Sequence, residues 1–432
     1  MKKNLSKRIS TATELLNSKY SNNQSTTGLL PAREEAKKRF KKLGAPLTKD
    51  EYWKFSSPSR FTSIKIQNET KTYKSDLLTD KNQEDVNIFF IDGVLDQSYS
   101  EENDLHDGLE LLSMRDEVGS DQFWVQELYG QLECVSHEKI TRSLSAFNTV
   151  CASEGLFIRV KQSFKKRLVI HYVGEELNSD CVIHNLVKLE ENAEFKLIEK
   201  GEGASRINRL IEIDLLSNSH LSHIRYFGDN IFSDVLNQVF VRQAQKSYYN
   251  QFTSVVNNKF IRNECYVSLD GEEAKVSLSG ANLGSESNVQ DDTIFVAHLN
   301  RDCESRQVFK KVLKENATGV FQGKIFVTSK AQKTDGYQVS KGLLIGNESR
   351  FLTKPELEIY ADDVVCSHGS TSGAIDEDSL FYLNSRGVSK KEATDMLILA
   401  FLDEAVSEIE SDSLADGVRE LLRKSLETRN ER

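Results

Sequence analysis

Proline and paired cysteines are scarce in this chain of 432 residues. It contains four prolines, three of which lie within the first 60 residues. The six cysteines are scattered and form no Cys-x-x-Cys motif: Cys134, Cys151, Cys181, Cys265, Cys303 and Cys366. This distribution argues against a disulfide framework and against a zinc or iron–sulfur site built by this chain alone. We therefore expect the protein to work in a reducing compartment such as the cytoplasm.

Long apolar runs and an excess of positive charge are also lacking. No hydrophobic segment approaches the roughly 18 residues that a membrane-spanning helix needs. The first 21 residues have neither the apolar core nor the small-residue cleavage site of a secretory signal. The formal net charge is −10 at pH 7, which argues against nucleic acid as a general partner. The expected protein is cytoplasmic, with no membrane and no nucleic acid among its partners.

Complete catalytic motifs are absent as well. The chain has no His-Glu-x-x-His and no Gly-x-Gly-x-x-Gly. The segment GVFQGKI (319–325) is one residue too short between its glycines for a phosphate loop and lacks the hydroxyl residue after Lys324. The segment GSTSG (369–373) has Thr371 where a nucleophile elbow needs serine. We therefore expect a protein that is not an enzyme.

The hydrophobic pattern divides the chain into three regions. Residues 1–155 are mixed, with helical stretches and a short strand and turn at 86–96. Residues 156–385 consist of short strands in which apolar and polar residues alternate, separated by turns built on Asn and Gly. Residues 386–432 are helical again, and Ser389 followed by Glu392 predicts a capping box at the start.

The central region contains a loose repeat in which turn residues precede an alternating strand. It recurs at NAEFKLIE (192), NSHLSHIR (218), GEEAKVSLSG (271), NATGVFQGKIFV (316) and NESRFLTKPELEI (347). Many short strands with turn signals are typical of a β-sandwich, a β-barrel or a β-solenoid. The repeat favours a solenoid, but because its intervals are irregular the other two architectures stay open.

Cys366 and His368 form the candidate metal- or cofactor-binding pair. If strand alternation continues unbroken through PELEIYADDVVCSHG, both share the outward, polar face with Glu356 and Glu358, whereas a bulge near Asp362 would reverse their direction. Thiolate and imidazole are good ligands for iron or zinc, but two ligands make only half a site. The remaining ligands would have to come from elsewhere, and an incidental surface pair is the alternative.

The helix predicted after residue 388 is apolar on two sides. At about 100° per residue, one stripe contains Ala393, Leu397, Ala400 and Phe401, and the opposite stripe contains Ile398, Leu402, Val406 and Ile409. One side can cover the β region and the other can meet a partner protein. The alternative is a helix buried wholly within its own domain.

At the level of motifs, the chain resembles the SufB/SufD family, the scaffold proteins of the SUF iron–sulfur assembly machinery. The resemblance is carried by GKIFVTSKAQKTDGYQVSKGLLI, KPELEIYADDVVCSHGSTSGAIDEDSLFYLNSRG and the final helix, and upstream by LDGEEAKVSLSGANL and GAPLTKDEYWKFS. It is similar to SufD because CSHGST stands where SufB has an EHEAT type of segment and LFYLNSRG lacks a Cys after the Tyr. Ser340 departs from the family pattern, which has Asn there.

The resemblance implies a right-handed parallel β-helix core with helical ends, and a complex of one SufB, two copies of the SufC ATPase and one SufD. It implies that a nascent cluster is shared at the SufB–SufD interface, where His368 matches the SufD histidine and Cys366 the neighbouring cysteine. The isolated chain would then hold no cofactor, and SufC would bind the C-terminal helices. A homodimer in the absence of SufB stays open.

Two other functions compete with a scaffold. A β-solenoid enzyme acting on polysaccharides would share the strand pattern, although such enzymes are usually secreted. A purely structural interaction module would leave Cys366 and His368 as ordinary surface residues.

Overall fold

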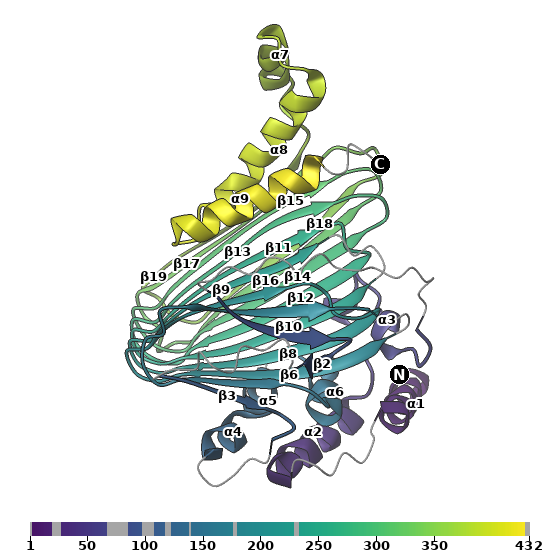
Figure 1. The fold of residues 1–432 in the computed structure, drawn as a ribbon, viewed down its shortest axis with the longest axis vertical. Coiled ribbons are helices and arrows are strands. Elements are labelled where there is room, and N and C mark those ends of the chain that lie inside the picture. Colours follow the sequence, from purple (N-terminus) through teal and green to yellow (C-terminus); the bar gives the residue numbers. More distant parts are fainter. Residues whose placement is uncertain are drawn as a thin grey trace.

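The protein is a parallel β-solenoid of about seven turns with helices at both ends (Figure 1). This architecture confirms the predicted fold class. The computed structural model describes residues 2–19, 27–66, 85–96, 108–116, 122–137, 140–175, 179–228 and 233–427. Parts of the predicted regions 1–155, 156–385 and 386–432 lie outside these ranges. Across the described residues, no helix combines the length and the apolar character needed to cross a bilayer.

Successive strands of the solenoid alternate between two long sheets. Sheet A runs in the order β19-β17-β15-β13-β11-β9-β7-β5-β1-β2, and sheet B in the order β18-β16-β14-β12-β10-β8-β6-β4-β3. The strands of sheet A are β1 (Asp85–Ile91), β2 (Val94–Asp96), β5 (Arg167–Val173), β7 (Glu194–Lys200), β9 (His220–Gly228), β11 (Tyr248–Val256), β13 (Lys275–Gly284), β15 (Glu304–Leu313), β17 (Thr334–Leu344) and β19 (Val364–Gly373). Those of sheet B are β3 (Leu109–Ser113), β4 (Leu156–Val160), β6 (Asp180–Leu189), β8 (Arg206–Leu215), β10 (Asp234–Gln243), β12 (Phe260–Leu269), β14 (Val289–His298), β16 (Thr318–Val327) and β18 (Arg350–Ile359). The segment 319–325 therefore lies within strand β16 and does not form a phosphate-binding loop.

Residues with positive φ close one corner of successive turns, where the chain passes from sheet B to sheet A. They are Asn192, Asn218, Lys246, Glu273, Asp302 and Lys333. Each donates its backbone N–H to a carbonyl of the next turn, from Asn192 to Ser217 at 3.0 Å through to Lys333 to Asp363 at 2.6 Å. These bonds help to hold residues such as Lys and Glu in a backbone region that usually favours Gly and Asn. The varied residue types explain why the repeat looks irregular in sequence.

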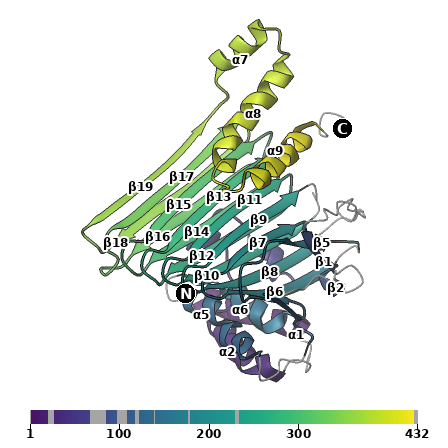
Figure 2. The same cartoon turned by 60° about the vertical axis from the view of Figure 1, so that its left-hand side comes forward.

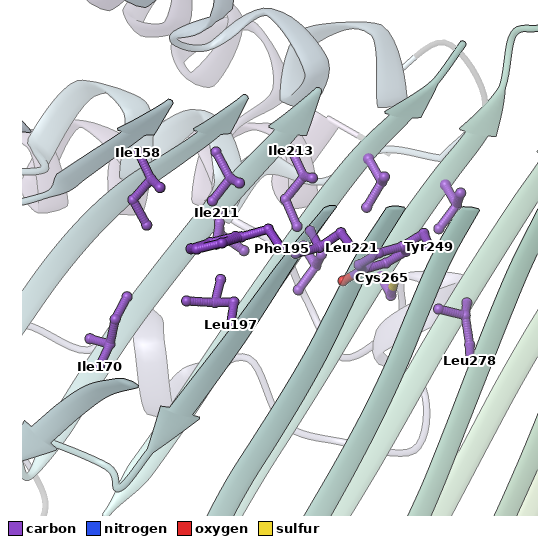
Figure 3. Packing of buried hydrophobic residues seen from close by; sticks show 14 of the residues in the cluster. Ile158, Ile170, Phe195, Leu197, Ile211, Ile213, Leu221, Tyr249, Cys265 and Leu278 are labelled. Carbon is purple, nitrogen blue, oxygen red and sulfur yellow. The ribbon is translucent and has the colours of Figure 1, made fainter. Parts of the chain in front are cut away.

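The space between the two sheets is filled by side chains stacked in rows along the solenoid axis (Figure 3). One row passes from Ile211 on β8 through Val239 on β10 to Cys265 on β12, because parallel pairing keeps these positions in register. All three are at most 2% exposed. We call this interior space the lumen.

The outer face of sheet B is covered by the N-terminal helices α1 (Lys2–Lys19), α2 (Leu30–Leu43), α4 (Phe123–Leu128), α5 (Gln131–Ser136) and α6 (Ser143–Cys151) (Figure 1). The short elements η1 (Thr27–Leu29), η2 (Glu51–Trp53) and α3 (Ser59–Thr62) belong to the same part of the chain. Pro31 lies in the first turn of α2, and Gly44 ends the helix with a φ of 73°.

The outer face of sheet A is covered by the C-terminal helices α8 (Lys390–Val406) and α9 (Asp412–Glu427). The predicted capping box between Ser389 and Glu392 is confirmed. The stripe that contains Ile398 and Leu402 is buried against the sheet, whereas Ala400 on the other stripe is exposed. Helix α7 (Glu377–Ser385) projects beyond the sheets (Figures 1 and 2).

Candidate functional site

The C-terminal end of the solenoid is open. Strands β18 and β19 occupy the terminal positions of their sheets and lie at the margin of the molecule (Figure 2). Every residue in these two strands is at least partly exposed, whereas all ten residues of β8 and of β12 are buried. Within the described residues, no further strand pairs with their outer edges. An unpaired strand edge can accept a strand from another chain.

Cys366 and His368 both lie on β19 at this open end. Alternate residues of a strand point to the same side, so the prediction that the two share a face is confirmed. The prediction that this face points outward is wrong. Cys366 packs beside Ile325 in the terminal part of the lumen, and its ladder partner on β17, Gly336, is buried. Both side chains are therefore directed to the open mouth of the lumen.

The corner between β18 and β19 explains the reversal. Leu357 and Ile359, at odd positions of β18, pack with the interior cluster, and so do Val364 and Cys366, at even positions of β19. The four corner residues 360–363 are not part of either strand. The alternation therefore restarts after the corner with the opposite parity, which is the outcome that a bulge near Asp362 would also have produced.

The thiol of Cys366 lies directly over Gly336. A Cβ atom added at Gly336 would stand 3.1 Å from Cys366 Sγ. Partial burial raises the pKa of the Cys366 thiol, a hydrogen bond from the Gly336 backbone lowers it, and the nearby Asp335 carboxylate raises it. A thiol with a raised pKa stays protonated at neutral pH. Metal binding would have to displace this proton before the sulfur could act as a ligand.

His368 is exposed at the mouth, and its ladder partner on β17 is Gln338. Gln338 is 1% exposed, and within the described chain neither its Oε1 nor its Nε2 has a hydrogen-bond partner. An unpaired buried amide costs about 1–3 kcal/mol. At the next inward-facing position of the same strand pair, Ser340 and Ser370 bond to each other at 3.0 Å. In contrast to the two serines, Gln338 and His368 face each other across the ladder without a hydrogen bond between them among the described residues.

Among the described residues, this end of the solenoid offers two candidate metal ligands, Cys366 and His368, and not a complete set. Searching the described residues finds no group of three or more His, Cys, Asp or Glu side chains arranged around a common point. The pair supplies one thiol and one imidazole, both of which suit iron or zinc. A complete site here would need ligands from another molecule.

The other described cysteines lie away from the open end. Cys134 belongs to α5 and Cys151 to α6, while Cys181, Cys265 and Cys303 are buried. Burial raises the pKa of Cys151, of Cys181 and of Cys265 to about 12. Thiols with such values are poor nucleophiles and poor ligands at neutral pH.

Four of the described histidines are buried: His171, His184, His223 and His298. His184 pairs with the Glu212 carboxylate and His223 with the Glu199 carboxylate, each at 3.0 Å. These buried pairs stabilise the fold. His106 lies outside the described residues. Among the described histidines, His368 alone lies on the terminal strand β19.

Sequence analysis missed Gly336 and Gln338. Each stands 30 positions before its partner, because Gly336 pairs with Cys366 and Gln338 with His368 (366 − 336 = 368 − 338 = 30). The only signal in the sequence was the solenoid repeat, whose interval was too irregular to give this register.

A second surface of interest lies on the C-terminal helices. Phe381 and Tyr382 on α7 are 73% and 57% exposed, and Met396 on α8 is 51% exposed. We call these three residues the α7–α8 apolar face. Next to it, a hollow between α8 and α9 is lined by Ala400, Arg419 and neighbouring residues. Large apolar side chains exposed on projecting helices are typical of a protein-binding surface.

Comparison with known proteins identifies the family. The family model "SUF system FeS cluster assembly, SufBD core domain" matches residues 172–401, and the model "SufBD protein N-terminal region" matches residues 15–170.

Individual relatives agree. The chain is 28% identical to the iron–sulfur cluster assembly protein SufD of Escherichia coli over 90% of this chain and 91% of the relative. It is 25% identical to an iron–sulfur cluster assembly SufBD family protein of Synechocystis over 91% and 90% of the two chains. It is also 25% identical to the chloroplastic protein ABCI7 of Arabidopsis thaliana over 87% and 81%. The chain therefore belongs to the SufBD family of the SUF system for iron–sulfur cluster assembly, with the resemblance to SufD that its sequence motifs predict.

Proposed function

We propose that this chain is a non-enzymatic scaffold subunit on which iron–sulfur clusters assemble, at an interface with a SufB-type partner and coupled to a SufC-type ATPase. One observation carries the proposal. A thiol and an imidazole stand together at the open end of the solenoid, beside strand edges that have no partner within the described residues. The cluster is the cargo of this site, and Cys366 and His368 are its ligands from this chain.

The edges of β18 and β19 are the proposed contact with the SufB-type subunit. An edge strand exposes unpaired N–H and C=O groups, which a strand from the partner can satisfy. Val365 on β19 is 71% exposed and alternates with Cys366, so it points away from the lumen. A partner that covers this end would bury Val365 and bring its own side chains to the mouth of the lumen. In the absence of that partner, a second copy of this chain is the alternative occupant.

The α7–α8 apolar face is the proposed contact with the ATPase. Its residues lie on the projecting end of the C-terminal helices, whereas the buried side of α8, including Leu402, already packs on sheet A. The two proposed partners would therefore bind different elements. Their binding can be separated by mutation.

Family membership favours the scaffold over a polysaccharide-acting enzyme or a purely structural module. The proposed setting is the cytoplasm, where reduced thiols are maintained. The test is anaerobic purification of the full chain, alone and after co-expression with SufB-type and SufC-type proteins from the same source. We expect iron and acid-labile sulfide in stoichiometric amounts only in the co-expressed complex. A stoichiometric cluster in the chain alone would contradict a shared site, and failure of the three chains to co-purify would contradict the complex.

A further inference from the structure

The lumen directly below His368 contains two buried amides without partners. Gln307 on β15, Gln338 on β17 and His368 on β19 occupy one row, since Gln307 pairs with Gln338 and Gln338 with His368. Gln307 is 0% and Gln338 1% exposed. Within the described chain, the Oε1 and Nε2 atoms of both residues lack hydrogen-bond partners.

Gly323, on the opposite sheet, leaves space for the carboxamide of Gln338. A Cβ atom added at Gly323 on β16 would stand 2.5 Å from Gln338 Oε1 and 2.8 Å from its Nε2. A side chain at position 323 would therefore force this amide to move. The Gln338 side chain thus extends towards sheet B, one solenoid turn before His368.

The surroundings of Gln338 leave few groups that could satisfy it. Ser340, two positions along β17, is already bonded to Ser370. Gly336, two positions before it, has no side chain and lies against the Cys366 sulfur. Two polar side chains occupy the ladder positions next to Gln338: the amide of Gln307, to which it is not bonded, and the imidazole of His368.

We propose that Gln338 is the positioning residue of His368: its Oε1 accepts a hydrogen bond from the ring N–H that faces the lumen, directly or through one water molecule. The other ring nitrogen then keeps its lone pair and is directed outward as the ligand. Histidines that bind metals usually donate their second N–H in this way, which fixes the tautomer and the orientation of the ring. The inference rests on the proposed role of His368 as a cluster ligand.

The chain offers a matched control in Gln307. Gln307→Met and Gln338→Met each remove one unpartnered amide from the same row of the lumen, but only Gln338 is the neighbour of His368. If both glutamines were merely structural, the two substitutions would have similar effects. The positioning role predicts that only Gln338→Met affects His368.

The first measurement is the tautomer of His368 in the full-length chain without any cluster. Long-range 1H–15N correlation spectra of 15N-histidine-labelled protein report it, and the spectrum of His368→Ala assigns the signal. We expect one dominant tautomer in the wild type and in Gln307→Met, and a mixture in Gln338→Met. Gln338→Glu keeps an acceptor oxygen in place and should retain the wild-type tautomer. Gln338→Leu replaces Gln338→Met if the latter does not fold.

The second measurement is cluster maturation in cells that depend on this chain. Loss of a residue that orients a metal ligand typically costs about 10–100-fold, so we expect a fall of about tenfold in Gln338→Met and none in Gln307→Met. An unchanged tautomer or unchanged maturation in Gln338→Met, with His368→Ala inactive, would overturn this inference alone. Full activity of His368→Ala would instead overturn the proposed function.

Discussion

The sulfur of Cys366 packs against Gly336, its partner in the β17–β19 ladder. A Cβ atom added at Gly336 would stand 3.1 Å from Cys366 Sγ and 3.4 Å from Ile325 Cδ1, so the sulfur would have to move for any larger residue. The position of the thiol at the mouth of the lumen therefore depends on a residue one full turn earlier in the chain.

Gly336→Ala is expected to push the Cys366 thiol towards solvent. Overpacking typically costs about 1–3 kcal/mol, and Cys366 lies at an open end where it can shift, so the protein should remain folded. We expect Cys366 to react faster with a disulfide reagent such as DTNB and cluster maturation to fall. Gly369→Ala is the control, since the nearest atom to its added Cβ is Val339 Cγ2 at 4.0 Å. Equal thiol reactivity in both variants would contradict the contact.

His368→Ala is expected to abolish most cluster maturation and to leave folding and complex assembly intact. The side chain is exposed, and the one hydrogen bond proposed for it is to Gln338, so its loss should change the free energy of unfolding by about 1 kcal/mol, too little to unfold the chain. Cys366→Ser should give a milder defect. The measurement is complementation of a strain that lacks its own SufD-type subunit, with gel filtration of the complex. Ser367→Ala, on the opposite side of β19, is the control; wild-type maturation in His368→Ala would refute the assignment.

Val365→Asp and Phe381→Asp are expected to separate the two partners. Both residues are more than 70% exposed, at 71% and 73%, so neither substitution should unfold the chain. A buried unpaired charge costs several kcal/mol, on the order of the loss that abolishes a protein contact. Val365→Asp should weaken binding of the SufB-type protein only, and Phe381→Asp binding of the ATPase only.

Pull-down with each partner, together with thermal melting, measures the effect. Leu402→Asp provides the contrast, because Leu402 is 1% exposed against sheet A and its replacement should destabilise the chain itself. Loss of both partners in either surface variant would show that the two contacts are not separate.

His298 is expected to make the fold sensitive to acid. Burial lowers the pKa of His298 from 6.5 to about 3, and its Nε2 lies 2.8 Å from Ser305 Oγ. Below pH 6.5 the unfolded chain therefore binds a proton that the folded chain does not, and stability falls by about 1.4 kcal/mol per pH unit. Between pH 7 and pH 5 this residue should cost about 2 kcal/mol. Urea unfolding of wild type and His298→Gln at both pH values measures it, and parallel losses in the two proteins would contradict it.

Much of the local structure could be predicted from the residues alone. The capping box of Ser389 and Glu392 depends on contacts within a few positions, and it is confirmed. The strands that begin near Asn192 and Asn218 follow turn residues that favour positive φ, and they too are where the pattern places them. The corners at Lys246 and Lys333 gave no such signal, because hydrogen bonds to the next turn hold them.

The sequence by itself singled out Cys366 and His368 as the candidate ligands, and it placed the two on one face of a strand. Only the tertiary structure decided which face that is. Alternation within a strand is a local property, whereas the corner between Ile359 and Val364 resets the parity and directs both side chains to the lumen. Gly336, Gln338 and Gly323 came into the site in the same way. Their neighbours are set by the register between successive turns, which is a long-range property of the solenoid and not of any short segment.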